Sequence, residues 1–193
     1  MKLKFNVMNK SQFNWAGRCF GPAVRSIKSA AVLLLCAGAA LAAQATDNRA
    51  PEVPEIAVEA GNKVHFHGFG IGVQIYTWNG SSWGTAVPDA TLFDGHGVVA
   101  LHFAGPTWQS NSGSTVVGAL PPEKHVIIDQ TAIPWLLLKA ASAEGAGIFA
   151  GTTFIQRVNT VGGMAPATNG TFVGQVARVP YSADYFFYRS AND

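Results

Sequence analysis

The sequence has few charged residues and almost no cysteine. Only 12% of its 193 residues are charged, and both cysteines, Cys19 and Cys36, lie in the first 45 positions. The low charge argues against a disordered chain, because disorder needs high charge and low hydrophobicity, whereas 48% of this chain is hydrophobic. The lack of cysteine after position 45 excludes thiol catalysis and disulfide bonds there, so stability must come from core packing.

No phosphate-binding or acyl-transfer motif occurs in the structural context that it needs. Gly68 to Gly72 reads G-F-G-I-G, but a dinucleotide-binding fingerprint has a different glycine spacing and leads into a helix. Gly80 to Gly84 reads G-S-S-W-G, which has the spacing of a Gly-x-Ser-x-Gly elbow. It lies in a predicted hairpin turn, whereas the elbow joins a strand to a helix, and there is no phosphate-binding loop. A Ser-His-Asp arrangement is not excluded by composition, so the sequence does not decide whether the protein is an enzyme.

Residues 1–45 have the pattern of a secretory signal peptide. Residues 1–28 carry six basic residues and no acidic one, the apolar stretch 30–42 follows, and small-x-small cleavage sites end it. The apolar stretch is about 13 residues, which is too short to span a bilayer comfortably, although a signal anchor is the alternative. Leu35 before Cys36 argues against lipidation. We expect export to the periplasm or the medium, with no stable membrane span after cleavage.

Cleavage would also reverse the net charge. Six of the 13 basic residues lie in the leader, so seven would remain against 11 acidic residues, a net charge of −4 in place of +2. A basic surface is the electrostatic footprint of nucleic-acid binding. We therefore expect no nucleic-acid partner.

A chain cleaved after Ala42 or Ala45 would contain no cysteine. We predict that a reducing agent leaves its melting temperature unchanged, because there is no disulfide to break. Calorimetric scans with and without reductant measure this. A shift of several degrees would mean that the cleavage site or the cysteine assignment is wrong.

The chain after residue 45 has the pattern of β-structure, with little or no helix. We expect an extended polar arm at 46–55 and one all-β domain at 56–190. About ten short strands, separated by glycine, asparagine and proline turns, predict a β-sandwich or a small β-barrel. Two neighbouring stretches, 63–69 and 70–78, read as separate strands, and Pro180 breaks the last strand pattern.

The longest apolar run after the leader is AIPWLLLKAA at 132–141. A short apolar run bounded by polar segments predicts a strand buried on both faces. We place it at 133–138, in the centre of the domain. A helix over 136–144 is the alternative, since those residues also favour helix and Pro134 suits a first helical turn.

Five sequence blocks resemble those of a known family. They are GVQIYTW (72–78), HFAGPTW (102–108), AIPWLLL (132–138), FIQRVNTVGGMAP (154–166) and VPYSADYFFY (179–188). In this order the blocks resemble the domain-of-unknown-function family 3455, exported bacterial and fungal proteins, over about 53–189. The resemblance implies export and one domain, and it brings no established activity.

One departure from that family concerns cysteine. Relatives tend to have a cysteine at the position of Trp78 and another near Thr168 or Asn169, and both are absent here. A joint loss is what a disulfide pair would show, since one half alone leaves a free thiol. The resemblance therefore implies that Trp78 lies close to the 168–169 loop.

Several polar and aromatic residues in apolar strands suggest a shallow binding pocket. The candidate ligand-binding residues are Gln74, Tyr76, His102, Trp108 and Arg157. The expected partner is an unknown small molecule or envelope component. Alternatively these residues are structural: aromatic rings fill the core, His102 bonds a backbone carbonyl, and Arg157 forms a buried ion pair with Asp184. If Arg157 has a functional role instead, it would bind a carboxylate or hydroxyl group of a ligand together with Gln156.

A histidine pair gives a second candidate site. The candidate metal ligands are His65, His67 and His102, with His96 as the alternative third ligand. Residues two apart in a strand project to the same side, and a histidine-only site suits zinc or copper. The alternative is a polar outer side, with Val64 and Phe66 both facing the core. We expect no cofactor, with zinc or copper at these histidines as the alternative.

Overall fold

The computed structural model describes residues 49–193, so the predicted signal peptide and the start of the predicted arm lie outside the described residues. Nearly all regular structure in this range is β-strand, as predicted. The strands are β1 (Asn62–Thr77), β2 (Val87–Asp94), β3 (Gly97–Phe103), β4 (Thr107–Ser110), β5 (Thr115–Gly118), β6 (Lys124–Val126), β7 (Trp135–Glu144), β8 (Thr152–Gly162) and β9 (Val176–Ser190).

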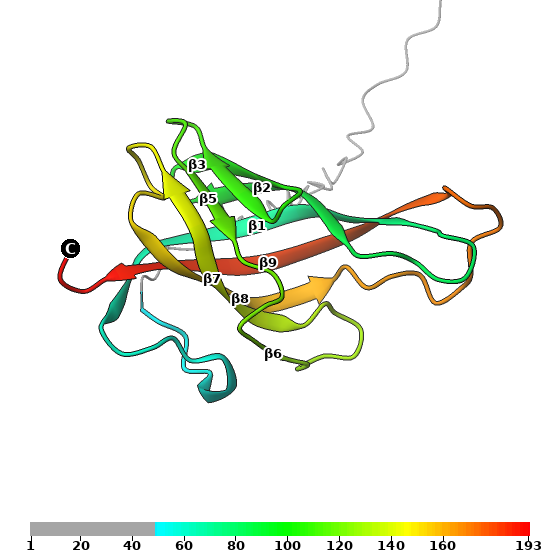
Figure 1. Ribbon diagram of the computed structural model, residues 1–193, viewed down its shortest axis with the longest axis horizontal. Coiled ribbons are helices and arrows are strands. Elements are labelled where there is room, and N and C mark those ends of the chain that lie inside the picture. Colours follow the sequence, from blue (N-terminus) through cyan, green and yellow to red (C-terminus); the bar gives the residue numbers. More distant parts are fainter. Residues whose placement is uncertain (1–48) are drawn as a thin grey trace, which may run out of the picture. The chain divides into compact units, whose positions relative to one another are not determined.

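The strands form a closed antiparallel barrel (Figure 1). They are ordered β5-β4-β3-β2-β1-β9-β8-β7-β6, and β5 also pairs with β7, which closes the ring and leaves β6 outside it. Closure is possible because β7 is long: its first half pairs with β6 and its second half with β5. The structure therefore selects the barrel from the two predicted architectures.

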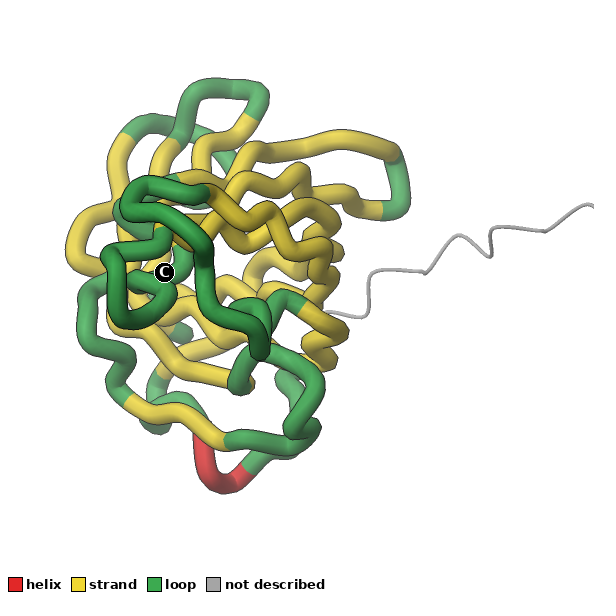
Figure 2. Tube along the Cα trace, turned by 90° about the vertical axis from the view of Figure 1, so that its right-hand side faces the viewer, coloured by secondary structure: helices red, strands yellow, loops and turns green. Residues whose placement is uncertain are grey.

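Figure 2 shows the one helical turn of residues 49–193, a 3-10 helix at Pro54–Ile56. The polar arm was expected to be extended as far as residue 55, so this turn corrects the expectation at the end of the arm. Ile56 is fully buried against the outside of the barrel. No helix in the described part of the chain is long and apolar enough to cross a membrane.

Three predicted boundaries are wrong. The stretches 63–69 and 70–78 form the single strand β1, because β9 pairs along nearly all of it. β9 continues through Pro180, which lies opposite Val73. The apolar run is strand as expected, but β7 extends over 135–144, so the helix alternative fails there.

The two faces of the barrel wall carry two apolar clusters. The interior cluster is rich in aromatic rings and includes Trp108, Tyr181, Tyr185 and Phe187. The outer cluster lies around Ile56 on the outside of β7, β8 and β9 and includes Leu137, Phe154, Val158, Phe186 and Tyr188. Leu138 belongs to the interior cluster and Leu137 to the outer one, so β7 is buried on both faces as predicted.

Glycines on one face of β1 make room for the aromatic interior. A Cβ atom on Gly70 would lie 2.7 Å from the ring of Tyr185, and one on Gly72 would collide with the backbone of Asp89 and Ala90 in β2. Gly68 occupies the same alternating face and faces Leu92. The G-F-G-I-G stretch is therefore a strand whose glycine face leaves room for large side chains from neighbouring strands.

Candidate functional site

A pocket opens at one mouth of the barrel. It has a volume of about 160 Å³ and is lined by residues of β1, β2, β3, β4, β7 and β8, together with the β3–β4 turn and the segment that leads into β2. Its polar lining includes Gln74, His102, Trp108 and Arg157. The structure therefore brings together four of the five residues that the sequence suggested for ligand binding.

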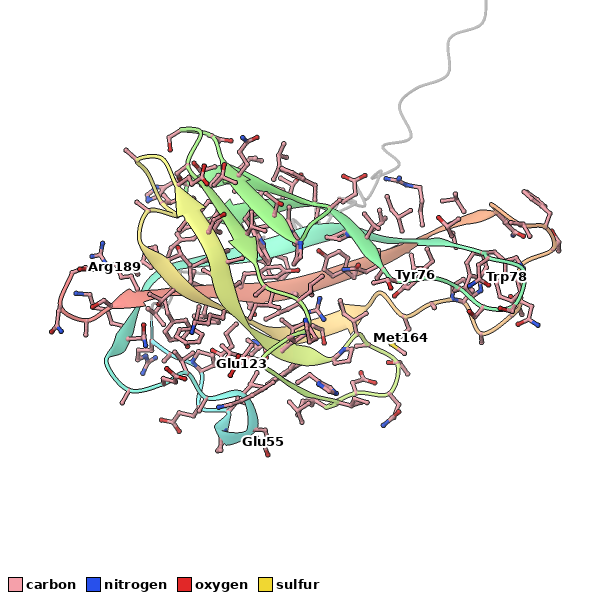
Figure 3. All side chains as sticks on the ribbon, viewed as in Figure 1. Glu55, Tyr76, Trp78, Glu123, Met164 and Arg189 are labelled. Carbon is pink, nitrogen blue, oxygen red and sulfur yellow. The ribbon has the colours of Figure 1, made fainter. Side chains whose placement is uncertain are left out.

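Tyr76 is the fifth candidate, and it does not line this pocket. Its hydroxyl donates a 2.6 Å hydrogen bond to the carbonyl of Gly163, and its side chain is buried. Figure 3 shows Tyr76 and Trp78 following one another along the far end of β1. Tyr76 thus anchors the segment after β8 to β1.

His102 and Trp108 form a stacked pair on neighbouring strands. Their ring centroids lie 4.1 Å apart with an interplanar angle of 4°. His102 Nδ1 donates to the carbonyl of Thr107 at 2.9 Å, which confirms the predicted bond to a backbone carbonyl. Burial lowers the pKa of His102 to about 3, against the effect of the Thr107 bond, and the charge of Arg157 lowers it further. The ring is therefore neutral, and its Nε2 is an acceptor.

Arg157 brings a positive charge into the pocket wall. Its Nη2 donates to the carbonyl of Pro134 at 2.7 Å, while its Nε is buried without a hydrogen-bond partner. The predicted ion pair with Asp184 is wrong, because Asp184 binds His67 Nε2 at 2.8 Å and Asn159 Nδ2 at 2.9 Å.

The register of β8 and β9 explains this difference. The two strands are neighbours, as the sequence suggested, but Arg157 lies opposite Tyr185 and Val158 lies opposite Asp184. Successive side chains of a strand point to opposite faces. Arg157 therefore lies on the interior side of the wall and Asp184 on the outer side.

Gln156 is also separated from Arg157 by this alternation. Its Nε2 donates to the carbonyl of Ile56 at 3.0 Å, and its Oε1 accepts a 2.7 Å bond from the Tyr188 hydroxyl. The idea that Gln156 and Arg157 share a ligand is therefore wrong. Gln156 instead fixes the 3-10 turn to the outside of the barrel.

The candidate metal ligands are not brought together. His67 stacks on Phe186 at 4.1 Å, on the outer side, and bonds Asp184, whereas His102 lies in the interior. His65 Nε2 lies 3.2 Å from the Thr152 hydroxyl. Within residues 49–193 no group of three or more His, Cys, Asp or Glu side chains is placed to hold a metal ion.

A β-bulge changes the faces at the start of β1. Val64 lies opposite Tyr188 and Phe66 opposite Phe187, so His65 is an extra residue in the ladder. Val64 consequently packs in the outer cluster and Phe66 against the interior cluster. The expectation that Val64 and Phe66 share one face is therefore wrong.

Trp78 lies next to the 168–170 loop, as the family resemblance implied. A Cβ atom on Gly170 would collide with the Trp78 ring. Trp83, which pairs with Trp78 in a β-bridge, donates its Nε1 hydrogen bond to the carbonyl of Thr168 at 2.9 Å. Packing of these rings holds this junction together without a cysteine.

The sequence did not reveal the apolar part of the pocket lining. Leu136 and Leu138 face the pocket from β7, and Pro88 and Pro106 lie across from them. The alternation of Leu136, Leu137 and Leu138 was a readable signal for two of these. No sequence signal pointed to the two prolines, because the barrel closure that brings their segments to this mouth depends on pairing between distant strands.

Comparison with known proteins gives a family but no activity. No curated protein and no solved structure matches the chain. One family model does, described as a protein of unknown function (DUF3455), and it covers residues 59–189. The chain therefore belongs to the DUF3455 family.

Proposed function

We propose that the protein is an exported, non-catalytic binding protein whose barrel-mouth pocket holds a small organic molecule. The observation that carries this proposal is a set of polar groups in the pocket lining without protein partners. Of four buried side-chain nitrogen or oxygen atoms without a hydrogen-bond partner in residues 49–193, two belong to lining residues: Trp108 Nε1 and Arg157 Nε. Gln74 is a buried lining residue as well, although its amide atoms are not among those four.

These groups make the empty pocket costly. Buried polar groups almost always have partners, and each one without a partner costs about 1–3 kcal/mol. An acceptor on a ligand that reaches these N–H groups would remove that cost.

The size of the pocket limits the ligand. Its volume of about 160 Å³ is close to the roughly 150 Å³ of an engineered protein cavity that accepts benzene. A molecule with a single ring, or a short branched chain of similar volume, fills it. The open mouth lets such a molecule enter without unfolding of the wall.

The chemistry of the lining favours binding over turnover. Among the lining residues there is no carboxylate, thiol or serine, and Thr85 carries the one aliphatic hydroxyl. His102 is neutral, and its Nδ1 proton is committed to the carbonyl of Thr107. A nucleophile with an adjacent base, which covalent catalysis requires, is therefore missing from this wall. The signal-peptide pattern of residues 1–45 supports export.

Blocking the mouth should abolish binding. Ala104 is exposed and lines the pocket in the β3–β4 turn, so Ala104→Trp places an indole across the opening. Ligand-observed NMR with a library of single-ring fragments should detect binders to the wild type that Ala104→Trp no longer binds. Ala167→Trp, an exposed alanine outside the pocket, is the matched control and should keep them. Fragments that still bind the Ala104→Trp variant would contradict the proposal. A library in which no fragment binds the wild type would contradict it as well.

A further inference from the structure

We propose that the ligand of this pocket is a small monocarboxylate with an apolar body, and that its carboxylate binds the guanidinium of Arg157. This inference rests on the proposed function, namely that the pocket binds a small molecule at all. It adds the chemical class of that molecule, which follows from the charge, the hydrogen-bonding groups and the walls of the site.

No acidic side chain of residues 49–193 forms an ion pair with Arg157. Two ion pairs occur within residues 49–193, His67 with Asp184 and Arg178 with Asp89, and neither involves Arg157. The titratable neighbours that feel its charge are Tyr76, His102, Tyr181 and Tyr185, and none of them is an acid that ionises near neutral pH. A partly buried cation is costly unless it is paired, so the site is incomplete without an anion.

The hydrogen-bonding groups also select an acceptor. Arg157 Nε and Trp108 Nε1 are N–H donors without partners, and the Gln74 amide adds an N–H₂ group in the same lining. An ionised carboxylate is an acceptor only, with two oxygens and about four lone-pair sites. Hydrogen bonds between a guanidinium and a carboxylate are among the stronger ones in proteins and are often bidentate.

One cation limits the ligand to one negative charge. Arg157 is the sole charged residue among the lining residues, so a dianion such as phosphate would bring an uncompensated charge into the pocket. The remaining wall, with Leu136, Leu138, Pro88 and Pro106, is apolar. It contacts hydrocarbon more favourably than a second polar group, because burying an unpaired polar group is costly. An aromatic or branched aliphatic monocarboxylate meets all three conditions.

The test compares benzoate, benzamide and inorganic phosphate as probes by isothermal titration calorimetry with the purified protein. Benzamide has nearly the shape of benzoate without the charge. Benzoate should bind saturably and about 10-fold or more tighter than benzamide, because hydrogen bonds to charged groups contribute more than neutral ones. Phosphate should not bind. Arg157→Gln should remove the preference for benzoate while benzamide still binds, and Arg178→Gln, which removes an exposed cation, should preserve it.

The outcomes separate the two proposals. Equal affinities of benzoate and benzamide in the wild type would overturn the carboxylate inference and leave the binding function standing. Phosphate binding as tight as that of benzoate would overturn the requirement for an apolar body. Binding of none of the probes would overturn the carboxylate inference, while the single-ring fragment screen separately decides the binding function. If Arg157→Gln does not fold, Arg157→Lys replaces it: with the charge kept but the planar fork lost, benzoate should remain preferred by a smaller ratio, and an unchanged ratio would contradict guanidinium binding.

Discussion

Replacing Gly72 by alanine should lower the free energy of unfolding by about 3 kcal/mol, at the upper end of the usual cost of overpacking. The added Cβ atom would collide with the Asp89 carbonyl and the Ala90 Cα of β2. Both are backbone atoms of the strand that pairs with Gly72, so no side-chain rotation relieves the contact. The barrel must either separate β1 from β2 or distort its register.

Urea unfolding followed by circular dichroism measures this loss. Gly95→Ala is the matched control, because a Cβ atom on Gly95 has open space and this glycine does not have a positive φ angle. The control should change stability by no more than about 0.5 kcal/mol, as is usual for surface substitutions. Equal stability of the two variants would show that β1 and β2 do not approach as closely as the structure has them.

Acid should destabilise the barrel through His102. Burial lowers the pKa of this histidine from 6.5 to about 3 in the folded state. The unfolded chain therefore takes up a proton below pH 6.5 that the folded chain does not. The stabilisation is complete above pH 6.5 and is lost as the pH falls from 6.5 towards 3. Between pH 6.5 and pH 4 the loss from this group is on the order of 3 kcal/mol.

His65 contributes in the same direction. Burial, and then the charge of Arg189, lower its pKa to about 4, but its side chain is only partly buried, so solvent screening reduces its share. The groups around His102 do not offset its own effect, because Trp108 is uncharged, Tyr185 is neutral in this range and Arg157 is a cation.

Denaturant unfolding at several pH values tests the role of His102. His102→Gln keeps a donor for the Thr107 carbonyl and removes the titration, so its stability should fall less steeply between pH 6.5 and pH 4 than that of the wild type. His96→Gln changes an exposed histidine in a turn and should keep the wild-type slope. A His102→Gln variant with an unchanged slope would contradict the buried, neutral ring.

The sequence predicted most of the polar pocket because the residue types were unusual for their places. Gln74, His102 and Arg157 interrupt apolar strand patterns, and polar residues kept in such patterns need a partner or a purpose. All of them fall on inward positions of their strands. The alternation of inward and outward residues along each strand is visible in the local sequence. The meeting of these strands at one mouth of the barrel depends on the pairing of β5 with β7, which no local pattern indicates.

Two errors of the sequence analysis come from the register of paired strands. A shift of one residue in register moves a side chain to the other face of a sheet. The pairing of Arg157 with Asp184 failed for this reason, since both strands were identified but not the register between them. The expectation that Val64 and Phe66 share a face failed similarly, because the bulge at His65 changes the facing of β1. The choice between a barrel and a sandwich likewise depended on pairing between strands that are distant in the sequence.

The most direct test of the pocket is the indole N–H resonance of Trp108 during a titration with benzoate. This N–H is buried without a partner, and its residue lines the same pocket as Arg157. The Trp108→Phe variant identifies its peak in the NMR spectrum of the ¹⁵N-labelled protein. We predict that the Trp108 peak shifts and saturates with the calorimetric affinity, while that of Trp78, which does not line the pocket, stays in place. A Trp108 peak that does not move at saturating benzoate would contradict the account.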